Sequence, residues 1–352
     1  MSRTAAALPG DLGDGFAVRA AREAGVAAKR LRALDLESPF FGVRTRRSEA
    51  DRRSPQSAPV RDSRADETRR LADLIARRAK AFAAIAAPDS CFCHATAAVM
   101  WGLPLPLRVL RRVAAATERN GESVAPRGID VGVLAPARPS RAAGVKGRQL
   151  SARLIDVRES NGLRLTNPAT TWAMLADELA VDELIELGDA IVFIPRRRGM
   201  LRGTSEDALG TPAELRAAAN TPYRRHSDRL RSAVDEIRIG AASPAETRYR
   251  IASIRAGLPL PELDFDVFTA TGAPIGFTEI AYPDYRVLVE YEGDHHRIDR
   301  DQWNRDIEKH SACADAGWRV IRLTARHLYP STAPAVAQVR TALLRAGWRP
   351  SS

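Results

Sequence analysis

Three glutamates near the carboxyl end of the chain have the type and spacing of a site that binds a metal ion. They are Glu279, Glu290 and Glu292. Arg286 to Glu292 alternates in the pattern of a β-strand, which places Glu290 and Glu292 on the same face. Carboxylate oxygens are the ligands that Mg²⁺ and Mn²⁺ prefer. The sequence therefore predicts a divalent-cation site in which these three side chains are ligands and catalytic groups.

A predicted hairpin brings the first of these acids to the other two. Pro283 and Asp284 have the turn-forming character that closes a hairpin. The pairing then joins position 282 to 287 and position 281 to 288, which leaves Glu279 opposite Glu290. Asp284 lies at the tip, on the order of 20 Å from Glu290 at about 3.3 Å per residue. Glu279 is therefore the better candidate for the first acid.

Length and composition indicate a globular protein of two or three domains. The chain has 352 residues, of which 45% are hydrophobic, and each domain can bury a core. No apolar run approaches the length of a membrane span, and no apolar signal core stands at the N-terminus. Three cysteines are too few for a disulfide framework. We expect a cytoplasmic protein without membrane contact.

The positive charge is concentrated in the first two thirds of the chain. Residues 241–352 hold 14 Lys and Arg and 14 Asp and Glu, so the whole excess of +11 lies in residues 1–240. This distribution is typical of a protein that holds a polyanion with one part and processes it with another. An Arg-rich proteome with solvated surface charge is the alternative that composition alone leaves open.

The first 44 residues have the pattern of a helix–turn–helix or winged-helix domain. Residues 16–36 carry apolar spacing for two short helices, and residues 40–44 read as the strand of a wing. Lys29, Arg30 and Arg32 are the residues we expect to contact DNA phosphates. A purely structural or partner-binding role for the two helices is the alternative.

Residues 45–66 are rich in Arg, Ser, Asp and Pro and read as a flexible linker. Residues 67–200 then read as a small α+β domain, with helices at 67–87, 168–179 and 184–193 and strands at 129–134, 149–157 and 163–165. Cys91, Cys93 and His94 lack the second ligand pair of a zinc site. We therefore expect His94 to cap a helix or to fill space, and we assign it no catalytic or metal-binding role.

Residues 201–242 read as a helical connector to the last domain, residues 243–352. A capping box at Ser243-Pro-Ala-Glu246 opens a helix, three antiparallel strands follow, and a helix, a strand and a helix complete the order. Glu246 is either the acid of that capping box or a peripheral acid that leans over the site. The fold class is α/β in the wider sense, that is, α+β.

An acid, a spacing of 11 residues and then Glu-x-Glu, in this order of elements, resembles the PD-(D/E)xK nuclease superfamily. More narrowly, several segments are similar to the very-short-patch-repair endonuclease-like domain: Glu279 with its turn, Val289-Glu-Tyr-Glu-Gly-Asp-His-His296, Arg305-Asp306 and Gly317-Trp-Arg-Val-Ile-Arg322. This resemblance covers about residues 243–330 and implies a restriction-endonuclease-like core. The segment from His94 to Pro104, with the predicted helix–turn–helix, resembles an AbiEi-like antitoxin region.

The resemblance implies hydrolysis of a phosphodiester with Mg²⁺ or Mn²⁺ as the cofactor. Glu292 is the third acid, and His296 is a general acid, a general base or a phosphate donor. Arg305 and Arg322 steady phosphate or transition-state charge. The chain departs from the superfamily at two positions, because Glu279 stands where Asp is usual and Glu292 stands in place of the signature Lys.

We therefore expect a metal-dependent DNA endonuclease or nickase with N-terminal domains for DNA binding or regulation. The alternative is a catalytically inactive, antitoxin-like DNA-binding transcriptional regulator that retains the nuclease fold as a scaffold. DNA is the expected partner, and the sequence leaves a protein partner or a homodimer open.

Overall fold

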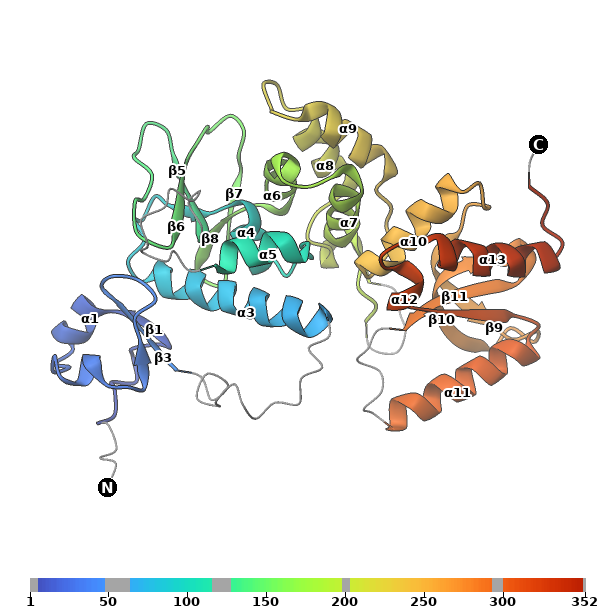
Figure 1. The fold of residues 1–352 in the computed structure, drawn as a ribbon, viewed down its shortest axis with the longest axis horizontal. Coiled ribbons are helices and arrows are strands. Elements are labelled where there is room, and N and C mark those ends of the chain that lie inside the picture. The colour runs from blue at the N-terminus through green and yellow to red at the C-terminus, as the bar shows by residue number, and fades with distance from the viewer. Residues whose placement is uncertain (1–5, 48–63, 116–127, 198–202, 293–299, 351–352) are drawn as a thin grey trace. The chain divides into compact units, whose positions relative to one another are not determined.

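The computed structural model describes residues 6–47, 64–115, 128–197, 203–292 and 300–350, with the side chains of 300–306 outside this part. The protein is a mixed α/β molecule that divides into two compact units, Met1–Leu175 and Ala176–Ser352 (Figure 1). No helix in the described ranges is long and apolar enough to cross a membrane. The predicted linker 45–66 lies mostly outside these ranges.

Residues 6–47 form a small three-stranded sheet rather than a helix pair. Its elements are β1 (Gly15–Ala17), α1 (Val18–Glu23), a 3₁₀ turn (Arg30–Arg32), β2 (Leu36–Glu37) and β3 (Val43–Arg46), in the strand order β1-β3-β2. The prediction of a second helix within 16–36 is therefore wrong, and the predicted strand at 40–44 begins three residues later. Phe16 pairs with β3 at Arg44 and is buried, so tertiary pairing overrides the local helical spacing.

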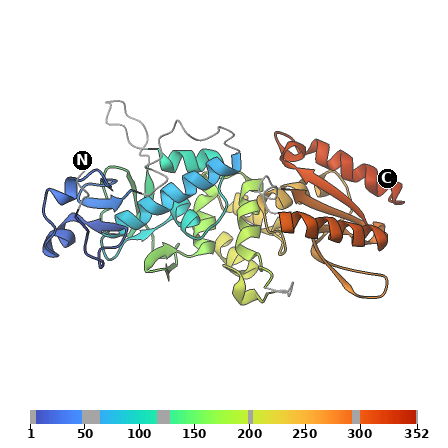
Figure 2. The same cartoon turned by 90° about the horizontal axis from the view of Figure 1, so that it is seen from below.

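The remainder of the first unit is a five-stranded sheet covered by helices. Its elements are α3 (Arg64–Ala83), β4 (Cys91–Phe92), α4 (His94–Met100), α5 (Leu107–Ala114), β5 (Ile129–Leu134), β6 (Val145–Leu150), β7 (Val157–Ser160), β8 (Leu163–Thr166) and α6 (Pro168–Met174), in the strand order β6-β5-β4-β8-β7. Helices α3 and α5 lie side by side (Figure 1, Figure 2). The predicted strand at 149–157 is wrong, because a turn at Ser151–Leu154 separates β6 from β7.

The second unit holds the predicted order of a helix, three strands, a helix, a strand and a helix. Its elements are α7 (Val181–Val192), α8 (Pro212–Ala219), α9 (Ser227–Glu236), α10 (Pro244–Arg255), β9 (Glu262–Phe268), β10 (Pro274–Tyr282), β11 (Val287–Glu292), α11 (Arg300–Asp315), β12 (Arg319–Thr324), α12 (Ala325–Leu328) and α13 (Ala333–Arg345). The short helix α12 was not expected. The strand order is β12-β11-β10-β9, with β11 and β12 parallel.

The hairpin register that the sequence predicts is confirmed at the two pairs next to the turn, whereas the pairing ends before Glu279 and Glu290. Tyr282 pairs with Val287 and Ala281 pairs with Leu288, and Pro283–Tyr285 form a 3₁₀ turn between the strands. Asp284 lies in that turn. The register therefore directs position 279 toward position 290.

Helices cover both faces of this sheet, as Figure 1 shows. On one face, side chains of α10, α12 and α13 pack on Val287, Val289, Ile321 and Leu323. On the other face, Cys313 of α11 packs on Leu288, Ala281 and Val267. Glu290 has the parity of Leu288, so it lies on the α11 face.

Helix α7 belongs to the second unit, whereas the sequence patterns assign it to the region 67–200. It packs against α9 and α10. Asp189 of α7 accepts hydrogen bonds from Arg250 Nη2 and Thr247 Oγ1 of α10, each at 2.8 Å, and from the backbone N–H of Arg238 at 2.7 Å. The side chains of Asp189 and Arg250 are 1% and 3% exposed. This buried ion pair joins α7 to α10, the helix that precedes the sheet of the second unit.

We expect Asp189→Ala to lower the free energy of unfolding of the second unit by about 3–5 kcal/mol, because it leaves the Arg250 guanidinium buried and unpaired. Asp182→Ala on the same helix is the matched control. It breaks an exposed pair with Arg255 and should cost less than about 1 kcal/mol. Calorimetric unfolding of the full chain measures both, and equal losses would contradict a structural role for the buried pair.

Candidate active site

Glu290 is the acid that the structure surrounds most completely. It lies on β11, and its carboxylate contacts two residues of α11, Lys309 through Nζ on Oε1 and His310 through Nε2 at 2.8 Å on Oε2. All three side chains are mostly buried. Because Cys313 one turn further along α11 packs on the sheet, the helix holds Lys309 and His310 over Glu290.

Glu279 lies where β10 and β11 separate. Pairing between these strands ends at Ile280 and Val289, although β11 continues beside β12 to Glu292. Beyond that point, Glu279 Oε2 accepts a 2.6 Å hydrogen bond from the backbone N–H of Tyr291. A carboxylate thus satisfies the donor that a longer β-ladder would pair with a backbone carbonyl.

Glu246 makes the predicted helix cap, and its side chain lines the same small cavity as Glu279. Its Oε1 accepts from Ser243 Oγ at 2.7 Å, its Oε2 accepts from the N–H of Ala242 at 2.8 Å, and its own N–H donates to Ser243 Oγ. Glu246, Glu279 and Tyr291 line one small cavity. The N-terminal end of α10 therefore presents a carboxylate to the place where the strands part.

Burial and mutual repulsion change the protonation of these acids. Burial, with the neighbouring Glu246 and Glu290, raises the pKa of Glu279 to about 8. Burial, with Asp264 and Asp189, raises the pKa of Glu246 to about 7. Burial also raises the pKa of Glu290, but Lys309 and His310 more than offset it, so that this pKa is lowered. Near neutral pH the site therefore holds one ionised carboxylate and two that are close to titration.

The remaining predicted residues are distributed differently. Glu292 forms an ion pair with Arg322 of β12, so these two predicted site residues neutralise each other. His296 lies outside the described residues, and Arg305 lies in α11 with its side chain outside them. In the first unit, Lys29 and Arg32 are exposed.

Arg30, also predicted to contact phosphates, donates its side-chain hydrogen bonds to residues of its own domain. Its Nη1 and Nη2 donate to the carboxylate of Asp35 at 2.9 and 2.7 Å, and its Nε donates to the carbonyl of Ala6 at 2.5 Å. This guanidinium closes the 3₁₀ turn onto the residues that follow it.

Lys309 and His310 are the functional candidates that sequence reasoning missed. A helical pattern places both on α11, but it does not give the rotation of α11 against the sheet, which decides whether either residue reaches Glu290. Lys309 Nζ also lies 5.8 Å from the ring centre of Phe277 on β10. A cation from α11 therefore lies beside both Glu290 and a ring of β10.

The donor set suits a hard divalent cation in kind. Glu279 and Glu290 supply carboxylate oxygens, and burial, followed by the neighbouring acids, raises the pKa of Glu279. As the side chains stand, no three His, Cys, Asp or Glu residues among those described are close enough together to hold a metal ion. The predicted set of Glu279, Glu290 and Glu292 is thus not gathered, because Lys309 and Arg322 pair with two of its members.

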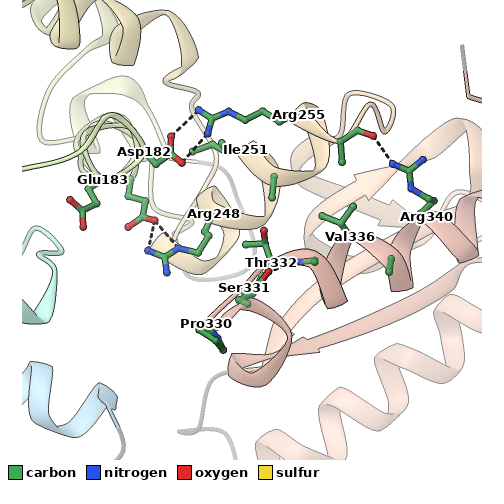
Figure 3. A pocket seen from close by; sticks show the side chains of 16 residues that line it. Asp182, Glu183, Arg248, Ile251, Arg255, Pro330, Ser331, Thr332, Val336 and Arg340 are labelled. Carbon is green, nitrogen blue, oxygen red and sulfur yellow. Dashed lines mark hydrogen bonds and ion pairs between the residues drawn. The ribbon is translucent and has the colours of Figure 1, made fainter. Parts of the chain in front are cut away.

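A cavity of about 780 Å³ in the second unit lies elsewhere. It is lined by α7, α10 and the start of α13, and Figure 3 shows Arg248 and Arg255 held by acids of α7. None of the four candidate glutamates lines it. It lies among helices that cover the sheet face opposite to the one that bears Glu290.

No protein-family model matches the chain, and comparisons with curated proteins and with solved structures likewise find no match.

The two acids of β10 and β11 should affect stability with opposite signs. The pKa of Glu279 is higher in the folded than in the unfolded state. Its contribution to the free energy of unfolding is therefore lost as pH rises from about 4.5 to about 8. Glu279→Gln keeps an oxygen for the Tyr291 N–H, so it should raise the melting temperature at pH 8.5 and change it little at pH 5.

The lowered pKa of Glu290 means that its contribution is present above its unfolded pKa and is lost as pH falls. Glu290→Gln should therefore lower the melting temperature at pH 8.5, where it leaves Lys309 without its carboxylate. Melting curves of both variants at the two pH values measure this. If both substitutions changed the melting temperature in the same direction at pH 8.5, Glu279 and Glu290 would not have pKa values shifted in opposite directions.

Proposed function

We propose that the second unit is a metal-dependent DNA endonuclease or nickase that hydrolyses a phosphodiester, with a restriction-endonuclease-like core over residues 243–352. The observation that carries the proposal is the pair of buried acids Glu246 and Glu279, which line one small cavity where β10 and β11 separate, with Glu290 and Lys309 near Glu279. Buried carboxylates whose pKa values are raised, with a cation near them, are typical of catalytic sites.

A divalent cation such as Mg²⁺ or Mn²⁺, held by Glu279 and Glu290, would polarise the phosphoryl oxygen and acidify a water. Lys309 then has the charge to stabilise the negative phosphate, and His310 has a nitrogen that can give or take a proton. Glu246 supplies a carboxyl near neutral pKa beside Glu279 and can orient a water. Arg322, close to the same face, is the candidate to contact the next phosphate.

The first unit, with its excess of positive charge, is proposed to bind or regulate DNA, in the manner of the antitoxin-like region that its sequence resembles. Lys29 and Arg32 remain the proposed phosphate contacts there. We propose a cytoplasmic location and no membrane contact.

We expect purified full-length protein to nick supercoiled plasmid in Mg²⁺ or Mn²⁺ and to lose this activity in EDTA. Glu279→Gln, Glu290→Gln and Lys309→Met should each lower the nicking rate by about 10²-fold or more, because each removes a charge that the reaction uses. Gel quantification of open-circular DNA over time measures the rate.

Glu262→Gln is the matched control, since Glu262 is an exposed acid at the start of β9 in the same sheet. Its rate should stay within about twofold of the parent, as expected for a surface substitution. If the Glu290→Gln variant nicked plasmid as fast as the parent, the catalytic site could not lie at Glu290.

A non-catalytic DNA-binding regulator is the second candidate, and one observation favours it. Both carboxylate oxygens of Glu290 already contact Lys309 and His310, so the acid that should bind metal is neutralised by side chains. In that case the buried charges specify the fold and do no chemistry.

This second function predicts that residues 1–175, a compact unit, bind duplex DNA without the rest of the chain. Binding to phosphates releases counterions, so affinity should fall tenfold or more when salt rises from about 50 to about 200 mM. Fluorescence anisotropy with a labelled duplex measures both properties. Absence of binding by this unit would count against a DNA role for the N-terminal positive charge.

A further inference from the structure

Two adjacent phenylalanines in the first unit have opposite environments. Phe40 is 4% exposed, and its ring packs edge-on against that of Phe82 on α3, with the ring centres 5.2 Å apart. Phe41, the next residue, is fully exposed, at 101%. Phe40 therefore anchors this segment to α3, whereas the ring of Phe41 takes no part in the core.

Phe41 lies in the tight turn that joins β2 to β3. The backbone N–H of Val43 donates to the carbonyl of Phe40 at 3.1 Å, so Phe41 and Gly42 are the two central residues of a β-turn. Gly42 has φ of 78°, the left-handed conformation that glycine adopts without strain. Its carbonyl accepts from the backbone N–H of Val18 at 2.7 Å. Backbone hydrogen bonds therefore fix the turn, and the Phe41 ring contributes nothing to them.

One guanidinium connects this hairpin to the exposed cations of the 3₁₀ turn. Arg44 Nη1 donates to Ser38 Oγ at 2.7 Å, in the connection between β2 and β3, and Arg44 Nε donates to the carbonyl of Leu31 at 2.8 Å. Arg32, the residue after Leu31, is exposed, as is Lys29. A single side chain thus joins the segment that carries these cations to the segment that carries the exposed ring.

A lone exposed ring near cations suits duplex DNA better than a single strand. Proteins that hold single strands stack successive bases on several aromatic rings along one groove. Among residues 6–47, all of which the structure describes, the other aromatic residues, Phe16 and Phe40, are buried. Proteins that kink duplex DNA insert an apolar side chain, phenylalanine among them, between two base pairs, while arginine and lysine contact phosphates nearby.

We propose that Phe41 inserts between two base pairs of duplex DNA bound by the first unit and kinks the duplex at that step. Arg32 and Lys29 contact phosphates beside the kink. Unstacking the step costs free energy, which burial of the ring and the added phosphate contacts offset. Pyrimidine–purine steps such as TA unstack most easily, so the kink forms there in preference. This inference rests on the proposed DNA binding by the first unit and adds a residue that deforms the duplex.

A duplex with a TA step at its centre and a donor and an acceptor dye at its two ends tests the inference with the full-length protein. At saturation the parent should raise energy transfer, because a kink brings the ends together. Phe41→Ala should weaken binding about tenfold or more, the order expected for loss of a stacked ring, and abolish this rise. Its affinity should keep the parent's salt dependence, since no phosphate contact is removed. Fluorescence anisotropy measures the affinity.

Phe41→Trp should restore both affinity and energy transfer, because it keeps a planar apolar ring at the turn. Leu34→Ala is the matched control, since Leu34 is an apolar side chain of the same small domain that is 87% exposed. It should bind and kink the duplex as the parent does. The melting temperature of Phe41→Ala should equal that of the parent, as expected for an exposed side chain, so a weaker affinity does not reflect a folding defect.

The outcomes separate this inference from the DNA role on which it rests. A parent that does not bind duplex DNA would overturn both. A parent that binds without a rise in energy transfer, or a Phe41→Ala variant with the parent's affinity and energy transfer, would overturn the inference alone. Equal losses in Phe41→Ala and Leu34→Ala, or a larger loss for a single strand than for the duplex, would overturn it as well.

Discussion

The hydrogen bond from the backbone N–H of Tyr291 to Glu279 is the contact on which the candidate site depends. β10 and β11 pair closely at their turn and separate after Ile280 and Val289. If the ladder continued, a carbonyl would fill the place of the Glu279 carboxylate, and the acid would point away from β11. Because the two strands separate, the backbone N–H of Tyr291 is left without a carbonyl of β10 and bonds the Glu279 carboxylate instead. The sheet therefore holds a carboxylate between two of its strands.

Charge balance around this contact explains why several acids can coexist in a half-buried place. Each carboxylate has a different local compensation: Glu290 has Lys309 and His310, Glu279 has a backbone N–H, and Glu246 has its cap. Only the first compensation contributes a full positive charge. Burial, followed by repulsion from neighbouring acids, raises the pKa values of the other two.

The sequence predicts those parts of the site that depend on local geometry. Turn chemistry and a period of two residues give the hairpin register at Tyr282 and Val287, and the spacing from Ser243 to Glu246 gives the cap; both are confirmed. The partners of Glu290 depend on the rotation of α11 against the sheet, which packing at Cys313 decides and no local pattern records. For the same reason the helical spacing at residues 16–36 misleads, because pairing of Phe16 with β3 overrides it.

Buried charge in both units is held by the same arrangement, a carboxylate enclosed by arginines or lysines. Around Asp189, backbone and hydroxyl donors share the carboxylate oxygens with the Arg250 guanidinium, and such a pair fixes the relation of two helices. The carboxylate of Glu279 has no such cation bonded to it: a backbone N–H is its partner, and burial with the neighbouring acids raises its pKa. A carboxylate held in this way contributes less to the stability of the fold at high pH than one paired with a guanidinium. This difference separates the structural ion pair at Asp189 from the candidate site at Glu279.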